Sequence, residues 1–264
     1  MISKAQRKAL FNLPEIYIIS YPKSGRTWLR VLLGKWLSLQ YNQQEDLILH
    51  TAHLSALCHL PIISFNHDGT EIEWKKSYKD LRADKSRYQD KRIILLVRDI
   101  RDTLVSAYFH ATRRDQLFKG SLSQFIRSQY FGARKILTFY RHWCINQTPP
   151  RDMLTLYYED MHDHPAAVLT RVLHFIGITE VDPDITDRAV EYASFDHMQQ
   201  MEKDRRFNYG MLQPGNIEDP QSFKVRQGRV GGYADHLSPR DIDYIRLMEM
   251  KWGGAFTRFP RISP

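Results

Sequence analysis

The sequence predicts an α/β domain with a central parallel sheet flanked by helices. Apolar runs at Ile16–Ser20, Ile93–Val97 and Met153–Tyr157 read as buried strands, and a helical pattern follows each of them. A shorter run, Ile62–Phe65, supplies a further strand. Strands that alternate with helices favour a parallel sheet covered on both faces, with the functional site at the carboxyl ends of the strands.

The 264 residues are enough for one large core, and we expect a single domain over residues 1–264. No repeat or low-complexity segment is visible, and polar stretches near 40–46, 66–91, 146–152 and 202–222 read as loops. The segment 117–143 predicts an amphipathic helix, and 239–252 predicts a C-terminal helix that is structural.

The formal net charge of +8 fits a polyanionic ligand such as a nucleotide cofactor, and fits nucleic acid or a membrane surface equally well. Cys58 and Cys144 are too few for a disulfide framework, and no apolar segment follows the basic start of the chain. The expected location is the reducing cytoplasm. The longest apolar runs are strand-sized, so we expect neither a bilayer span nor a membrane partner.

The first strand leads into Tyr21-Pro-Lys-Ser-Gly-Arg-Thr-Trp28, and an apolar stretch with helical spacing follows. Pro22 and Gly25 break the strand, so the predicted order is strand, tight loop, helix. The first N–H groups of that helix lack internal partners, and the helix dipole adds partial positive charge there. A phosphate is the natural ligand, with Lys23 reaching it from the side and the hydroxyls of Ser24 and Thr27 as further donors.

Two other interpretations of this loop stay open at the level of the residues. One is an ordinary strand-to-helix turn that happens to carry a lysine. The other is a P-loop nucleotide kinase, which would turn over ATP with magnesium. The kinase motif needs Gly, four spacers and then Gly-Lys, whereas here Lys23 precedes the only glycine of the loop.

The stretch Arg92–Tyr108 is the second element that indicates function. A buried strand runs into Arg98, and a helix begins near Arg101 and Asp102, where an acidic side chain suits the helix dipole. Arg98 and Ser106 can hold one anion only if the loop between strand and helix folds back. A salt-bridged helix cap is the alternative explanation of the charged residues.

Tyr21–Trp28 resembles the 5′-phosphosulfate loop of sulfotransferases that use 3′-phosphoadenosine-5′-phosphosulfate (PAPS), and is closest to the cytosolic type. Arg26 stands where that family usually has threonine. The pattern Arg-x-x-x-Asp-x-x-x-Ser resembles the family's 3′-phosphate motif, with Arg98, Asp102 and Ser106 on its matching positions. The resemblance implies PAPS as the cofactor and sulfuryl donor.

Further matches follow in the family's order. The resemblance implies that Tyr158, in Tyr-Glu-Asp, contacts the adenine, with Phe195 and Trp28 as further aromatic contacts. The loop with Arg226, Gln227 and Gly228 resembles the element that closes over the 3′-phosphate, although Gln227 replaces a lysine that Arg229 could restore. The family's dimerisation pattern is not visible in residues 234–243, so the oligomeric state stays open.

His67 follows a short strand in Phe65-Asn-His-Asp-Gly69. One of eleven histidines, it would by itself be read as a structural or surface side chain. The resemblance implies a catalytic base here, although the family's usual Lys-Thr/Ser-His reads Phe-Asn-His in this chain. His59 and His53 are the other candidates.

The resemblance implies transfer of a sulfuryl group from PAPS to a hydroxyl (or amine) of an acceptor by in-line displacement. The expected catalytic residues are Lys23 at the leaving phosphate oxygen, His67 as base, and Ser106 with Arg98 at the 3′-phosphate. No metal is expected. The acceptor cannot be read from the loops near 66–91 and 202–222. A basic nucleic-acid-binding module is the remaining alternative, but the Lys and Arg residues are dispersed and the aromatics fall mostly at core spacing, so we expect no nucleic-acid partner.

Overall fold

The computed structural model describes residues 14–207 and 210–252. Its sheet contains β1 (Ile16–Ser20), β2 (Ile63–Asn66), β3 (Arg92–Val97) and β4 (Asp152–Tyr157), in the spatial order β2-β1-β3-β4. All three pairings are parallel, with Ile18 of β1 aligned with Phe65 on one side and with Ile94 on the other. The predicted α/β class and parallel sheet are confirmed.

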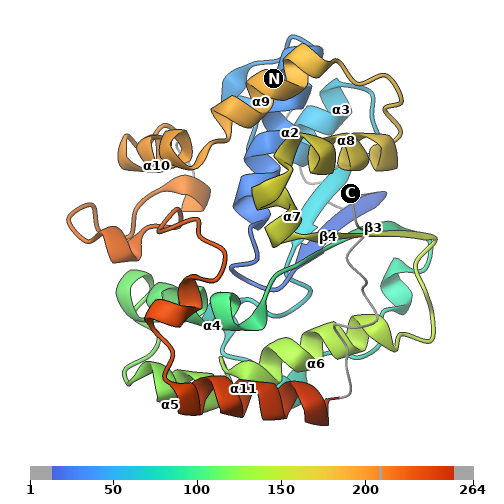
Figure 1. Ribbon diagram of the computed structural model, residues 1–264. Coiled ribbons are helices and arrows are strands. Elements are labelled where there is room, and N and C mark those ends of the chain that lie inside the picture. Colours follow the sequence, from blue (N-terminus) through green and yellow to red (C-terminus); the bar gives the residue numbers. More distant parts are fainter. Residues whose placement is uncertain (1–13, 208–209, 253–264) are drawn as a thin grey trace.

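Helices cover both faces of this sheet (Figure 1). On one face lie α2 (Arg26–Gln40), α3 (Thr51–Leu57), α8 (Pro165–Ile176) and α9 (Pro183–Tyr192). On the other lie α4 (Ile100–Phe109), α5 (Leu122–Arg127), α6 (Ala133–Cys144) and α11 (Pro239–Lys251). The shorter α7 (Tyr158–Asp163) follows β4, and α10 (Phe195–Lys203) lies to one side.

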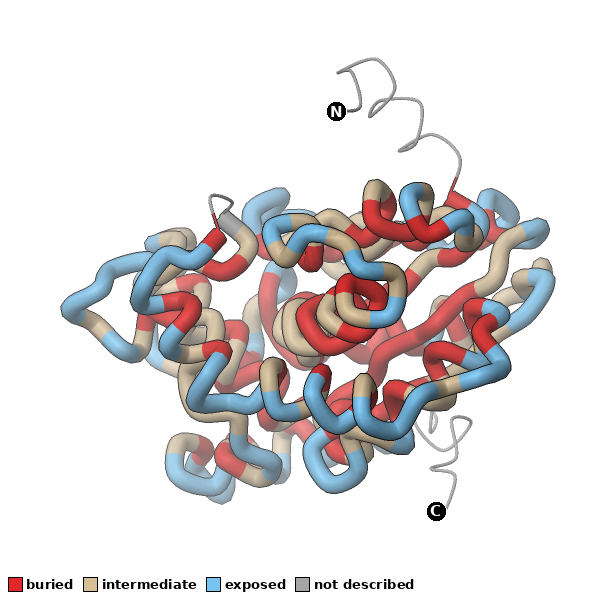
Figure 2. The backbone as a smooth tube through the Cα atoms, turned by 90° about the horizontal axis from the view of Figure 1, so that it is seen from above, coloured by how far each residue is buried: buried red, intermediate tan, exposed pale blue. Residues whose placement is uncertain are grey.

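The alternation of side chains along β1 explains the two layers. Ile16 and Ile18 belong to the hydrophobic cluster under α2, whereas Ile19 and Tyr21 belong to the cluster under α4 and α6. A strand buried on both faces has no polar side, which is why its sequence is a continuous apolar run. Figure 2 shows the buried segments running through the middle of the molecule, with exposed positions at its periphery.

The single helix predicted over residues 117–143 is wrong, because the structure breaks it into α5 and α6. Ser121 begins α5 with a capping box to Gln124, and Ser128 ends it in an extended conformation. At Gly132 a Cβ atom would lie 2.2 Å from the carbonyl oxygen of Ile126, so only glycine fits this turn. The amphipathic spacing continued across the break and concealed it.

The order of the strands reverses at β1, which makes the carboxyl end of β1 a topological switch point. From β1 the chain proceeds to β2 on one side, and it later returns to β3 on the other side of β1. In open parallel sheets ligands bind where the order reverses, beyond the carboxyl ends of the strands. Lys23, His67, Arg98 and Tyr158 all follow such strand ends. Across residues 14–207 and 210–252, no helix is both long and apolar enough to cross a membrane.

Candidate active site

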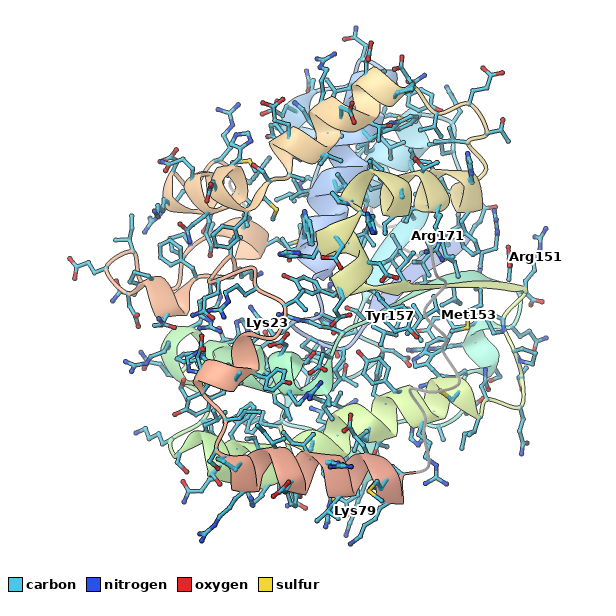
Figure 3. All side chains as sticks on the ribbon, viewed as in Figure 1. Lys23, Lys79, Arg151, Met153, Tyr157 and Arg171 are labelled. Atoms are coloured by element: carbon cyan, nitrogen blue, oxygen red, sulfur yellow. The ribbon has the colours of Figure 1, made fainter. Side chains whose placement is uncertain are left out.

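A cavity of about 610 Å³ opens at the carboxyl ends of the strands. Its wall contains nearly all the side chains that the sequence predicted for the site, although they come from segments far apart in the chain. These are Lys23, Gly25, Arg26, Thr27, Trp28, His67, Arg98, Ser106, Tyr158, Phe195, Arg226, Gln227 and Gly228. In Figure 3 the labelled Lys23 lies above α4, in the same region as the loop of residues 223–233.

The loop before α2 has the geometry of an anion site. Gly25 adopts φ 93° at the start of the helix, and no side chain caps the helix there within the described part of the chain. Backbone N–H groups at the start of α2 are therefore left for a ligand, together with the positive end of the helix dipole. A Cβ atom on Gly25 would lie 2.5 Å from the ring of Tyr158, so the glycine also makes room for that ring.

Ser24 is the predicted contact that does not line the cavity. Its side chain is fully buried and lies beside Tyr140 on α6. Its hydroxyl therefore faces the protein interior. The predicted contact of Ser24 with a ligand is left to its backbone N–H group.

Lys23 is enclosed among other cations. Burial, together with the charges of the neighbouring Lys224, Arg114 and Arg98, lowers its pKa to about 7. Such a depressed pKa on a lysine in a cavity is typical of a functional site. An anion placed beside Lys23 would restore the charged form.

Arg98 fulfils the condition that the loop after β3 folds back. Its guanidinium donates to the carbonyl oxygen of Lys23 at 3.0 Å and to that of Arg229 at 3.2 Å, and lies 4.0 Å from the centre of the Tyr158 ring. The helix cap is instead made by Asp99, which accepts from the backbone of Arg101 and pairs with its side chain. The salt-bridged helix cap is therefore present, but it pairs Asp99 with Arg101 and does not involve Arg98.

The loop of residues 223–233 is held at both ends. Asp102 accepts hydrogen bonds from the backbone N–H groups of Gly231 and Tyr233, at 2.8 and 2.9 Å. At the other end, the buried Glu202 accepts from the N–H groups of Lys224 and Val225. Asp102 thus positions the loop that carries Arg226, Gln227 and Gly228.

Within this loop Arg226 and Gly228 meet aromatic rings. Arg226 lies 4.2 Å from the centre of the Phe109 ring, and burial lowers its pKa to about 10, helped by Arg98. Gly228 has a positive φ, and a Cβ atom there would lie 2.4 Å from the ring of Phe195. Arg229 pairs with Asp235 at the surface, at 2.8 Å.

The predicted adenine contacts Trp28, Tyr158 and Phe195 all line the cavity. Trp28 and Tyr158 meet edge to face with ring centres 5.7 Å apart. Phe195, at the start of α10, is 36% exposed. Aromatic faces that are open to a cavity can stack on a nucleotide base.

The His67 ring is fixed by a backbone contact. Its Nδ1 lies 2.8 Å from the carbonyl oxygen of Ser20. Because a carbonyl can only accept, Nδ1 carries the proton and Nε2 offers a lone pair. Burial lowers the pKa of His67 well below its ordinary value, with Arg26 contributing, so the ring is neutral near pH 7. The alternative candidates His53 and His59 are not part of the cavity wall.

Sequence reasoning missed a row of side chains that continues the second motif. Arg98, Asp102 and Ser106 are followed, at the same spacing of four residues, by His110 and Arg114, and all five line the cavity. A regular α-helix would turn a spacing of four gradually away from one face. The π-helical segment His110–Arg114 widens the turn at this point and keeps the row aligned. The fourfold spacing was the available signal.

Three further members of the wall, Glu73, His110 and Asp115, lie together. Their potential ligand atoms are all within 4.8 Å of one another, an arrangement that could hold a metal ion. His110 Nε2 lies 3.0 Å from an oxygen of Asp115. Lys224 also lines the cavity, and it too was not predicted.

Comparison with known proteins identifies the family. The family model described as the sulfotransferase domain matches residues 13–251. Sulfotransferase 2A6 of Mus musculus is 25% identical over 90% of this chain and 84% of its own length. Sulfotransferase 1A1 of Canis lupus familiaris is 24% identical over 89% of this chain and 83% of its own length.

Solved structures agree on the fold. Mouse sulfotransferase SULT7A1 was solved in complex with PAP (3′-phosphoadenosine-5′-phosphate). It aligns with a TM-score of 0.60 at 18% identity, over 97% of this chain and 94% of that one. Retinol dehydratase, solved with androsterone and the inactive cofactor PAP, aligns with a TM-score of 0.55 at 18% identity, over 92% and 82%. The chain belongs to the sulfotransferase domain family, and the expectation that it is a sulfotransferase is confirmed.

Proposed function

We propose that this chain transfers a sulfuryl group from PAPS to a hydroxyl or amine of a small-molecule acceptor. The observation that carries the proposal is the joining of the phosphate loop to the second motif, where Arg98 donates to the carbonyl of Lys23. A 5′-phosphosulfate at the start of α2 and a 3′-phosphate near Ser106 and Arg226 would then be held by one connected set of donors. The solved relatives complexed with PAP support the same donor.

Lys23 serves as the cation at the bridging oxygen that leaves with the 5′-phosphate. Negative charge develops on this oxygen as the bond to sulfur breaks. The other cations that now depress the pKa of Lys23 would be offset by the charge of the cofactor, so Lys23 is protonated during the reaction. In-line transfer of a charged group depends mostly on such positioned donors.

His67 takes the proton of the acceptor. Its Nδ1–H is fixed by the Ser20 carbonyl, which leaves Nε2 as the base, and its lowered pKa keeps it unprotonated at neutral pH. The acceptor oxygen bonds to sulfur as its proton moves to Nε2, and the electron pair of the broken bond stays on the phosphate oxygen.

Small-molecule acceptors are supported by the relatives. Retinol dehydratase has been solved with androsterone and with retinol. The segment near residues 66–91, which contains His67, also contributes Ile72 and Glu73 to the cavity wall. The resemblance of Tyr21–Trp28 to the phosphosulfate loop of the cytosolic type leads us to propose a cytoplasmic enzyme.

The test is incubation of the purified chain with PAPS labelled in its sulfate, together with a library of hydroxylated and amine compounds. Labelled product and released PAP should appear in equal amounts. Hydrolysis of ATP in the presence of magnesium, without any transfer from PAPS, would contradict the proposal and favour a nucleotide kinase. A salt series with random oligonucleotides serves as the control for nucleic-acid binding, since phosphate-backbone binding weakens steeply as salt rises.

A further inference from the structure

Several ionisable side chains line the cavity besides those proposed to hold the cofactor phosphates. We use the name acceptor wall for Arg26, His67, Glu73, His110, Asp115 and Lys224, all of which line the cavity. Mutual effects on their pKa values place them near one another: Arg26 and Lys224 both lower the pKa of His67, and Glu73 raises that of Arg26. Ile72 and Val225 line the same cavity and supply apolar contact.

Arg26 is the donor of the acceptor wall. Its side chain makes no hydrogen bond or ion pair within residues 14–207 and 210–252, and its closest charged influences are Glu71 and Glu73. Arg26 replaces the hydroxyl residue that the phosphate loop usually carries; it lines the same cavity as His67 and contributes to the lowered pKa of that histidine. A guanidinium has five N–H donors, so this side chain is prepared to bind oxygen atoms of a ligand.

His110 and Asp115 are the acceptors opposite the phosphate loop. His110 Nε2 lies 3.0 Å from Asp115, while His110 Nδ1 is buried and has no hydrogen-bond partner in the described part of the chain. The side chain of His110 is only 9% exposed. The Oδ2 atom of Asp115 is also buried and has no hydrogen-bond partner among the described residues, and the exposed Glu73 adds carboxylate oxygens within 4.8 Å.

We infer that the acceptor is a hydrophilic, hydroxyl-rich molecule of the carbohydrate class, bound by Arg26 as donor and by Glu73, His110 and Asp115 as acceptors. This inference rests on the proposed sulfuryl transfer. A sugar offers neighbouring hydroxyls that each donate and accept, and fixed carboxylate, imidazole and guanidinium groups match such pairs. A flat apolar acceptor would leave two buried polar atoms, Nδ1 of His110 and Oδ2 of Asp115, without the hydrogen bonds that they lack within the described part of the chain, and this is costly.

A metal ion is the competing occupant of Glu73, His110 and Asp115, and the surroundings oppose it. Arg114 lies 3.8 Å from Asp115, and Lys23 lies close enough to His110 to lower its pKa. These cations already balance the carboxylates and repel a divalent ion. A neutral polyhydroxylated ligand experiences no such repulsion.

The test measures acceptor preference on the whole chain with saturating labelled PAPS. The polar panel contains mono- and disaccharides, and the apolar panel contains 2-naphthol and androsterone. We expect kcat/KM for the best sugar to exceed that for either apolar compound by about 100-fold or more, because a site built for hydrogen bonds discriminates strongly against ligands that cannot make them. Apolar acceptors equal to or better than every sugar would overturn the inference.

A binding experiment tests the inference independently of which sugars the panel contains. Calorimetric titration of 2-naphthol into the PAP-loaded chain should show weak binding, whereas His110→Phe, which makes the wall more apolar, should bind 2-naphthol about tenfold more tightly. His174→Phe, an exposed position on α8 outside the cavity, is the matched control and should behave like the parent. Tight binding of 2-naphthol by the parent chain contradicts the inference, as does turnover of no sugar by a chain that binds PAP. Failure to bind PAP would contradict the proposed function instead.

Discussion

At the scale of single residues, the surroundings of Lys23 and His67 lower the pKa values of both side chains. Lys23 has a pKa of about 7 because burial and neighbouring cations disfavour its charged form. His67 is held neutral by burial and by Arg26. The lysine is therefore prepared to gain a proton when an anionic cofactor binds, while the histidine is prepared to accept one from the acceptor.

Lys23 makes PAP binding dependent on pH. Above a pKa of about 7 the free lysine is mostly neutral, so binding of PAP must take up a proton and affinity should fall as pH rises from 7 to 9. Calorimetry in buffers of different ionisation enthalpy should detect this uptake. In Lys23→Met it should vanish, and turnover should drop by about two to three powers of ten, as for loss of an oxyanion donor. Lys79→Met, at an exposed lysine, is the control; turnover of Lys23→Met within a few-fold of the parent would assign the role to another cation.

His67 predicts a pH profile for catalysis. A base works when unprotonated, and the pKa of His67 lies below the ordinary value of about 6.5, so kcat/KM should fall only on the acidic side of that value. His67→Ala should lose about 10² to 10⁴ in rate together with this limb, while PAP affinity changes little. The same losses in His53→Ala or His59→Ala would show that the base is misassigned. An alcohol acceptor is needed, because an acidic phenol ionises unaided.

At the scale of elements, the site depends on close contacts between segments that follow different strands. The start of α2 packs against Tyr158 after β4, and the loop of residues 223–233 is fixed to α4 through Asp102 and to α10 through Glu202. In Figure 1 this loop, coloured orange-red, runs beside α4. A small change in one segment should therefore be felt by the ligand contacts of another.

Gly25→Ala tests this packing. The added Cβ would lie 2.5 Å from the Tyr158 ring at φ 93°, so the variant should be less stable and should bind PAP at least tenfold more weakly. Gly177→Ala is a matched control, since Gly177 also has a positive φ (102°) but nothing lies within 4 Å of its added Cβ. Urea unfolding should show a cost of about 1 kcal/mol for the control, without loss of PAP binding. Equal effects of the two substitutions on PAP affinity would contradict the packing role.

At the scale of the whole molecule, the fold class could be predicted from the sequence because the buried strands are continuous apolar runs. The phosphate loop could be predicted because Pro22, Lys23 and Gly25 mark it locally. The break between α5 and α6 was missed because apolar spacing continues through Gly132. Among site residues, His110 and Arg114 could have been found from their fourfold spacing after Arg98. The direction of Arg26 and the proximity of Glu73 to His110 depend on how distant segments pack, which no local pattern encodes.

The most direct test of the central claim, that this cavity binds a 3′-phosphorylated adenosine nucleotide as the donor product, is a comparison of PAP with AMP by calorimetry. Arg98, Ser106 and Arg226 all line the cavity and are proposed to hold the 3′-phosphate. Loss of a charge-assisted contact costs about 1.5–3 kcal/mol, so removal of that phosphate should weaken binding at least tenfold. Equal affinity for PAP and AMP would contradict the account.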